Sequence, residues 1–325
     1  MPSNRDNYPT QQQANIKAAV RAISHRMRNA ESDVLAILDA IPVSSIKVNQ
    51  LANNELFYRY ELSATRWLQT EQDIKDIIAR WLEVQDQTGK PARWFFDPFI
   101  DKSYESGTKA SLTQISSALS AVITDDNPLG MSLLTQLDYE NVLMQPQYRD
   151  RIALVAARTF NDMVGFADSN GLKLAQILAA GMAGGKSPAI ISRQMQDEFA
   201  SVQGWRALRI ARTEINTAHN QAKYDQDIDA RDRLGIEIKE MHISALTETT
   251  RIHHAERHGL LFTPEAQKAW WETGGNRINC YCSVVTIVLI DGVPVQKSLI
   301  KKTRAKGQKY LGIERKYDDG INPDD

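Results

Sequence analysis

Apolar residues recur every three or four positions through most of the first half of the chain, which is the rhythm of amphipathic α-helices. The first such stretch alternates steps of four and three before Pro42 ends it, at Ile16, Val20, Ile23, Met27, Ala30, Val34, Ile37 and Ile41. This pattern predicts one helix with a narrow apolar seam. Two interpretations are open, because the seam either packs on the rest of the chain or pairs with another subunit or another protein.

Further helices are expected as far as residue 228. Residues 55–84 predict one amphipathic helix or a pair of them, and the later helical patterns cover 108–123, 129–143, 148–168, 171–183, 187–199 and 205–228. Ser187 and Pro188 suit the cap and the first position of their helix. Four aromatic residues surround Pro98 in the segment 93–99, which usually marks a buried connection and sometimes an exposed docking patch.

The rhythm changes after residue 235. Residues 236–243 alternate apolar and polar positions, and residues 281–290 do so more weakly with a β-branched run at 284–288. After Gly292 the chain becomes basic and then acidic, which predicts a solvated extension or an arm that a partner orders. We therefore expect a mainly α N-terminal half, residues 1–149, followed by a small α+β C-terminal module, residues 150–292, and an extended tail, residues 293–325.

Composition narrows the class of protein. The 325 residues allow two folding units, and 42% hydrophobic with 24% charged residues is ordinary for a chain that folds. Lysine and arginine number 39 against 40 acidic residues, so contact with nucleic acid needs a local patch. No stretch approaches the roughly 20 apolar residues of a membrane helix, and the N-terminus is polar where a signal peptide is apolar. We expect a protein that stays in the cytoplasm where it is made and contacts no membrane.

Five of the six histidines lie in one segment shortly before the only two cysteines, namely His219, His242, His253, His254 and His258. Cys280 and Cys282 are separated by one residue, which suits neither an ordinary disulfide nor the wider gap of a zinc finger. Thiolate sulfur and imidazole nitrogen are nevertheless ligands that zinc prefers. One interpretation is a structural zinc site formed by Cys280, Cys282 and His254, with His253 and His258 less favoured. The other is a pair of reduced, buried thiols.

Two enzyme motifs are incomplete. The run 184–187 resembles the end of a Walker A loop, yet Ala180 stands where that loop needs glycine and a helix is expected where it needs a strand. The run 253–256 lacks the order His-Glu-x-x-His of zinc proteases. Neither ATP hydrolysis nor metalloprotease chemistry is therefore expected.

Arg209, Arg212 and Glu214 lie close together in an otherwise apolar helical stretch. An arginine beside a glutamate occurs in transferase sites, but it more often forms a buried ion-pair network that fixes the position of a helix. We favour the structural interpretation.

Three motifs, in order between residues 171 and 290, resemble the Mu F-like minor head protein family of tailed bacteriophages. They are Ala-Arg-Thr-Glu at 211–214 with Asn220 downstream, then Thr250 and Arg251 leading to a histidine and a glycine, and finally the cysteine pair. The residues that the resemblance gives a structural role are Arg212, Thr213, Glu214, Asn220, Thr250, Arg251 and Gly259, while His254, Cys280 and Cys282 also match. Thr247, Thr249 and Tyr281 stand where the family has Asp, Arg and Arg, which removes three charges from any network that uses them.

The resemblance implies a minor head protein, not an enzyme, that joins the procapsid near the portal. Its partners would be the portal protein and the major capsid or scaffolding protein, and its final place would be the capsid interior or the portal vertex. Residues 150–292 would then be the head-morphogenesis module and residues 1–149 the docking region. Double-stranded DNA would be contacted by the basic tail residues Lys301, Lys302, Arg304, Lys306 and Lys309. The alternative is an ADP-ribosyltransferase-like toxin or virion-delivered effector that uses Arg212 and Glu214.

Overall fold

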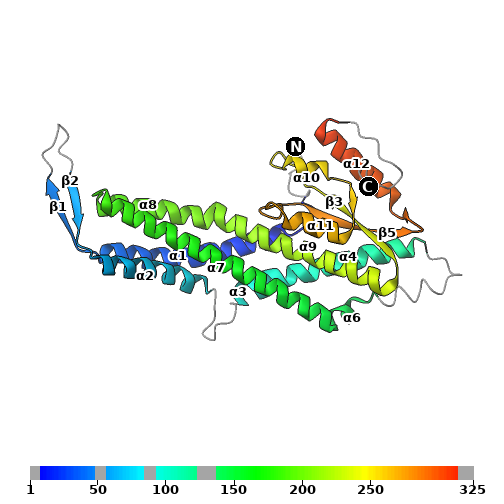
Figure 1. Ribbon diagram of the computed structural model, residues 1–325, viewed down its shortest axis with the longest axis horizontal. Coiled ribbons are helices and arrows are strands. Elements are labelled where there is room, and N and C mark those ends of the chain that lie inside the picture. The colour runs from blue at the N-terminus through cyan, green and yellow to red at the C-terminus, as the bar shows by residue number, and fades with distance from the viewer. Residues whose placement is uncertain (1–7, 48–55, 84–92, 123–136, 314–325) are drawn as a thin grey trace. The chain divides into compact units, whose positions relative to one another are not determined.

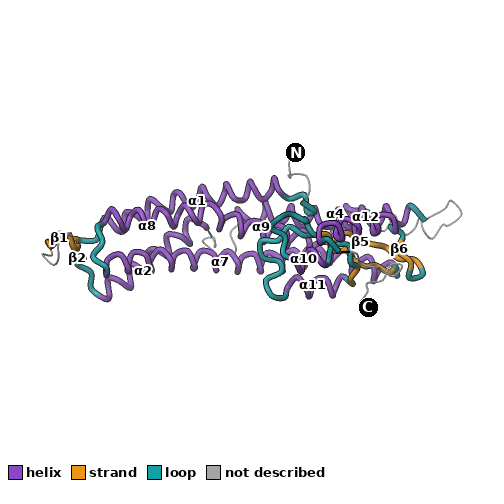
Figure 2. The backbone as a smooth tube through the Cα atoms, turned by 90° about the horizontal axis from the view of Figure 1, so that it is seen from above, coloured by secondary structure: helices purple, strands orange, loops and turns teal. Residues whose placement is uncertain are grey.

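The computed structural model describes residues 8–47, 56–83, 93–122 and 137–313 (Figure 1). The chain forms two compact units, and each combines segments from both halves of the sequence. The helical unit contains residues 17–96 and 156–211, and the sheet unit contains residues 1–16, 97–155 and 212–325. Helices dominate the described chain, and the strands occur in two separate places (Figure 2). The expectation of a mainly α protein with an α+β module toward the C-terminus is confirmed.

Long helices lie side by side in the helical unit (Figures 1 and 2). Its helices, some of which continue into the sheet unit, are α1 (Gln13–Asp39), α2 (Ala64–Leu82), α3 (Arg93–Phe95), α7 (Pro146–Ala183), α8 (Pro188–Ser201) and α9 (Ala207–Leu234). A π-helical turn, Val202–Arg206, joins α8 to α9. Ser187 caps α8 as expected, because its side chain accepts a hydrogen bond from the backbone N–H of Ile190.

The apolar seam of α1 packs inside the chain. Ile23, Met27, Ala30 and Val34 are fully buried. A polar contact also joins α1 to α2. The Trp81 indole of α2 donates a hydrogen bond to the carboxylate of Asp33 on α1 over 2.7 Å. The first of the two interpretations of the seam is therefore the one that the fold shows.

Two predictions about the helical unit are wrong. Residues 56–60 begin no helix, because β1 (Val43–Lys47) and β2 (Leu56–Tyr60) form an antiparallel hairpin. Its aromatic residues suit a strand, and the backbone N–H of Tyr58 donates to the carbonyl of Gly185. The expected break near residue 170 is also absent, since α7 runs on through Gly171. A Cβ at Gly171 would lie 3.0 Å from the Cα of Lys75, so this glycine serves close helix packing.

The segment 93–99 forms α3 and the start of a second π-helical turn, Phe96–Asp101. Phe95 and Phe99 are buried, so the interpretation as a buried connection holds. The turn 184–187 follows a helix, and the Lys186 ammonium donates to the Gln194 side chain over 3.2 Å. The structural context of a phosphate-binding loop is therefore missing there, as expected.

The sheet unit is built on a four-stranded antiparallel sheet with strand order β4-β3-β5-β6. The strands are β3 (Glu237–Ile243), β4 (Leu261–Phe262), β5 (Ser283–Ile290) and β6 (Val293–Pro294). The helices that belong to this unit alone are α4 (Lys102–Ser120), α6 (Tyr139–Met144), α10 (Ile252–Glu256), α11 (Pro264–Glu272) and α12 (Lys297–Leu311). Helix α4 packs against β5, and α11 packs against β3. The strands expected at 236–243 and 281–290 are thus confirmed.

The tail does not run out into solvent at residue 293. Residues 297–311 form α12, which buries one face through Ile300, Thr303, Arg304 and Gly307. Their spacing of three and four residues is that of an amphipathic helix, a signal that the many lysines obscured. The acidic end at 314–325 lies outside the described residues. Among the described residues, no helix combines the length and the apolar character that crossing a bilayer needs.

Candidate functional site

Helix α9 holds the two cysteines through a row of asparagines. Asn216 and Asn220 are four residues apart, so they project from one face of the helix. The Asn216 side-chain amide donates to the carbonyl of Cys280 over 2.8 Å, and that of Asn220 donates to the carbonyl of Cys282 over 3.1 Å. Both asparagines are buried. The backbone of the Cys-x-Cys segment is therefore fixed to the helix that carries the Ala-Arg-Thr-Glu motif.

Arg212 and Thr213 fix the residue before the cysteines. The Thr213 hydroxyl accepts a hydrogen bond from the backbone N–H of Asn279 over 2.9 Å, and the Arg212 guanidinium donates to the Asn279 side chain over 2.6 Å. Asn279 has φ 55°, a left-handed conformation that asparagine tolerates better than most residues. The Arg212 guanidinium also lies 3.9 Å from the ring centre of Tyr281. Both motif residues thus hold the segment that contains the two cysteines.

Glu214 forms the ion pair that the sequence suggested, but with a different arginine. Its carboxylate is fully buried and lies 3.4 Å from Arg277, which belongs to the loop before the cysteines. Arg209, in contrast, is exposed. The pair therefore connects α9 to the same loop as Arg212 and Thr213.

Arg251 organises that loop from the opposite side. Its guanidinium donates to the carbonyls of Asn276 and Ile278 over 2.8 and 3.0 Å, and also to that of Gly275. Arg251 is the residue that precedes α10. One side chain therefore sets the position of the loop relative to the helix that carries His254.

The three departures from the family pattern have local substitutes. The Thr250 hydroxyl accepts a hydrogen bond from the backbone N–H of Thr247 over 2.8 Å, and the Thr247 and Thr249 hydroxyls lie 3.3 Å apart. Tyr281 stacks on Tyr8 with ring centres 4.2 Å apart. Hydroxyl contacts and ring stacking are therefore made at the positions where the family carries charge.

Gly259 matches the family for a steric reason. Its φ of +82° lies in the left-handed region, and a Cβ there would come within 2.8 Å of Arg304 Cγ. The buried Arg304 donates to the Gly259 carbonyl over 3.0 Å. Arg304 is thus part of the interior of the sheet unit, whereas Lys301, Lys302, Lys306 and Lys309 of the same helix are exposed.

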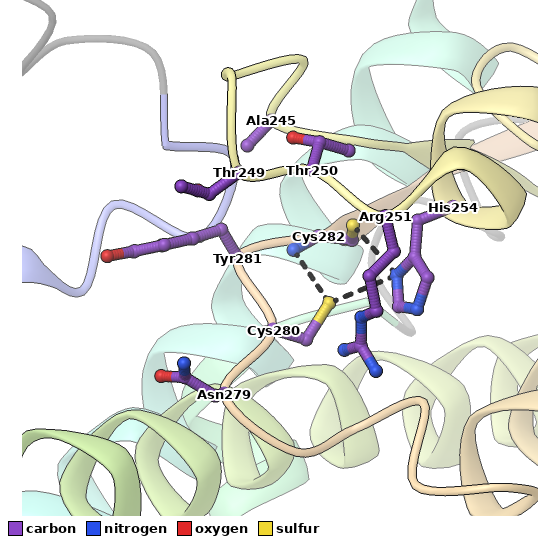
Figure 3. Close-up of a pocket in the computed structure, with 9 residues that line it drawn as sticks. All are labelled: Ala245, Thr249, Thr250, Arg251, His254, Asn279, Cys280, Tyr281 and Cys282. Atoms are coloured by element: carbon purple, nitrogen blue, oxygen red, sulfur yellow. Dashed lines mark hydrogen bonds between the residues drawn. The ribbon is translucent and has the colours of Figure 1, made fainter.

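The thiols of Cys280 and Cys282 lie close to the imidazole of His254. The His254 Nδ1 atom lies 3.4 Å from the Sγ atoms of both Cys280 and Cys282 (Figure 3). All three side chains are buried, and they line one side of a pocket that residues 249–251 and 279–281 complete. Hydrogen bonding from the Cys282 thiol lowers the pKa of Cys280, and the same bond and burial raise the pKa of Cys282. The sequence correctly indicated that these three residues come together.

His242 joins this cluster, which the sequence analysis missed. Single donor atoms of His242, His254 and Cys282 all lie within 4.8 Å of one another. In the pairing of β3 with β5, His242 lies opposite Val284, so its side chain shares a face with Cys282. The placement of His242 beside Cys282 depends on the register of β3 and β5, which the sequence alone did not specify.

The other histidines are used elsewhere. His253 is exposed, and its Nε2 atom lies 3.1 Å from the Asn276 side chain. The His258 Nδ1 atom accepts a hydrogen bond from the backbone N–H of Ser244 over 3.0 Å. Burial lowers the pKa of His258 to about 4 and that of His219, on α9, to about 3. These three imidazoles therefore belong to loop and core packing.

Most of these contacts join residues of one continuous segment of the chain. Residues 173–285 match the model of the family described as Phage Mu protein F like protein. This segment is Mu F-like. No curated protein and no solved structure matches the chain.

The Mu F-like segment includes α9, β3, α10 and both cysteines, and it ends within β5. The matched family is one of phage head morphogenesis, and the similarity covers residues 173–285 of the 325 residues. Most of the helical unit and all of α12 lie outside the matched residues. Within the match, the motif residues hold the Cys-x-Cys loop in place.

Proposed function

We propose that this protein is a minor head protein of a tailed bacteriophage that acts in head assembly at the portal. The observation that carries the proposal is the Mu F-like match over residues 173–285. The geometry supports a structural role, because Arg212 and Glu214 both contact the loop before the cysteines. An ADP-ribosyltransferase would need these two side chains to face a nucleotide. The head-assembly role is therefore the better supported of the two.

The partner of the protein in this role is the portal protein, with the major capsid or scaffolding protein as a further contact. The α1 seam cannot provide the docking surface, because Ile23, Met27 and Val34 are fully buried by the chain itself. The proposal therefore assigns portal binding to exposed residues elsewhere in the docking region, residues 1–149. Deleting residues before Pro42 would unfold the helical unit, so a deletion does not test docking.

The basic face of α12 supports a contact with packaged DNA. Residues 297–311 contain no acidic residue, and the exposed lysines lie opposite the buried face of the helix. Lysines that neutralise phosphates bind DNA without reading its sequence, which suits a genome that passes through the head. Arg304 takes no part in this contact because it is buried.

Mixing the purified protein with the portal protein of the same phage tests the assembly role. Size-exclusion chromatography with light scattering should give a complex of defined mass, and its stoichiometry gives the number of copies at the portal. Two unshifted peaks at micromolar concentrations of both proteins would contradict docking on the portal. Hydrolysis of NAD by the purified protein would instead support the enzyme alternative.

A further inference from the structure

We propose that Cys280, Cys282, His254 and His242 bind one zinc ion. The four side chains come from three places in the sheet unit, namely the loop before β5, helix α10 and strand β3. Two thiols and two imidazoles form a donor set that zinc prefers to magnesium or calcium. The site is independent of the role in head assembly, because it follows from these contacts alone.

The spacing of the donors fits a tetrahedral site. In a zinc tetrahedron with bonds of about 2.3 Å to sulfur and about 2.0 Å to nitrogen, the sulfur and nitrogen ligands lie roughly 3.5 Å apart. His254 Nδ1 lies 3.4 Å from each of the two thiol sulfurs. In Figure 3 both sulfur atoms point toward that nitrogen from the same side of the imidazole. The donor atoms of His242, His254 and Cys282 all lie within 4.8 Å of one another, and Cys280 joins this group through His254. His242 must therefore move toward the sulfur atoms to complete the set.

The backbone around the cysteines suits a thiolate pair. The Cys282 N–H lies 3.3 Å from Cys280 Sγ and donates to it. The carbonyls of both cysteines are held by α9, as described above, which keeps the two thiols on one side of the loop. A metal would reach them through the pocket lined by Thr250, Arg251 and Tyr281. Donors, support and an access route are therefore all present.

A nitrogen atom of His242 supplies an independent observation. The side chain of His242 is 0% exposed, and its Nε2 atom has no hydrogen-bond partner among the described residues. A buried polar atom without a partner costs about 1–3 kcal/mol, so it calls for a reason. A zinc ion bound by His242 Nε2 supplies that reason for His242.

Gln267 contacts the proposed ligand His242 and would not itself bind the metal. Its side-chain amide lies 2.7 Å from His242 Nδ1 and 2.7 Å from the Arg257 guanidinium. With Nε2 bound to zinc, the proton of His242 lies on Nδ1 and needs an acceptor. The amide of Gln267 must then turn its oxygen to the ring, with a shift of Arg257. Zinc binding thus changes the contacts of a residue that is not itself a ligand.

Metal content of the full-length protein tests the proposal. Protein purified without chelator should contain about one zinc per chain, and Cys282→Ser or His254→Gln should lose it. His253→Gln is the matched control, since it removes the neighbouring, exposed histidine and should keep the full equivalent. The proposal would be overturned if the wild-type protein contained no zinc and took up none when zinc was added. It would also be overturned if His253→Gln lost as much zinc as the ligand variants.

Cobalt substitution identifies the ligands without relying on variants that fold poorly. Co²⁺ added to the metal-free wild type should give the intense visible bands of a tetrahedral ion and the ultraviolet charge-transfer band of thiolate ligands. Removal of one sulfur in Cys280→Ser should weaken the charge-transfer band by about half. His242→Gln should lower the affinity for zinc by at least about tenfold, whereas an unchanged affinity would remove His242 from the set. A six-coordinate spectrum without charge transfer would overturn the whole proposal.

Discussion

Asn220 on α9 donates a buried hydrogen bond to the carbonyl of Cys282, 62 residues later in the chain. The same amide group accepts a hydrogen bond from the Ser283 hydroxyl over 2.8 Å. One side chain of the Ala-Arg-Thr-Glu helix thereby fixes both the second cysteine and the first residue of β5. Together with Arg212 and Thr213, Asn220 therefore positions the loop before β5 and the start of that strand.

Asn220→Ala should destabilise the sheet unit by about 1–3 kcal/mol, because it leaves the buried carbonyl of Cys282 without its donor. Urea unfolding followed by tryptophan fluorescence measures this change, since Trp270 and Trp271 lie in the sheet unit. The control is Gln221→Ala on the same helix, which removes only a local contact with Asp225 and should cost less than about 0.5 kcal/mol. Equal effects of the two variants would contradict the role of Asn220.

Gly259→Ala should be more damaging than Gly235→Ala. Both glycines have positive φ, so alanine is strained by about 1 kcal/mol at either position. A Cβ at Gly235 meets no atom within 4 Å, whereas one at Gly259 meets Arg304 at 2.8 Å. We expect an additional loss of roughly 1–3 kcal/mol at Gly259, measured as the difference in thermal or urea unfolding. Similar losses for the two variants would show that Arg304 moves aside without cost.

Acid should destabilise the protein in part through His219. Burial lowers the pKa of His219 from 6.5 to about 3, with a further contribution from the charge of Lys223. Between these two pKa values the unfolded chain binds a proton at this site and the folded chain does not, so stability falls as the pH falls from about 6.5 toward 3. The contribution is up to about 1.4 kcal/mol per pH unit.

The pH dependence of unfolding in His219→Gln measures that contribution. Its free energy of unfolding should fall less steeply than that of the wild type between pH 6.5 and 4.5. His25→Gln removes an exposed histidine on α1 and should leave the wild-type slope. If His219→Gln and the wild type have parallel profiles, His219 is not buried in its neutral form.

The exposed lysines of α12 should set the salt dependence of DNA binding. Lys302→Gln with Lys306→Gln removes two adjacent charges and should reduce the slope of log K against log salt by about 2. Lys17→Gln with Lys173→Gln removes two exposed lysines from other helices and should leave the slope unchanged. Fluorescence anisotropy with a short duplex at several salt concentrations gives the slopes. Equal slopes for both double variants would locate DNA binding elsewhere or exclude it.

The sequence predicted those parts of the fold that local patterns determine. Helix α9, strands β3 and β5 and the Ser187 cap follow from patterns over a few residues. The meeting of His254 with the cysteines was expected from ligand chemistry and from the family resemblance, not from local spacing. The hairpin of β1 and β2 was missed because its aromatic residues at 57–60 fit a helical face almost as well as a strand. The strand conformation is supported by a contact with a distant turn, the hydrogen bond from the backbone N–H of Tyr58 to the carbonyl of Gly185.

The role of His242 could not be predicted for a different reason. Its place beside Cys282 depends on the register between β3 and β5, which forms between segments about 40 residues apart. The continuous α7 likewise depends on the close approach of Lys75 to Gly171, which favours a small residue within a helix. In both cases the deciding contact joins residues that are distant in sequence.

The most direct measurement of the central claim is the protein content of heads purified from the phage that encodes this chain. We predict that quantitative mass spectrometry finds the protein in heads and procapsids at a small, constant number of copies relative to the portal protein. Heads that lack the protein, purified from cells in which it is abundant, would contradict its role as a minor head protein.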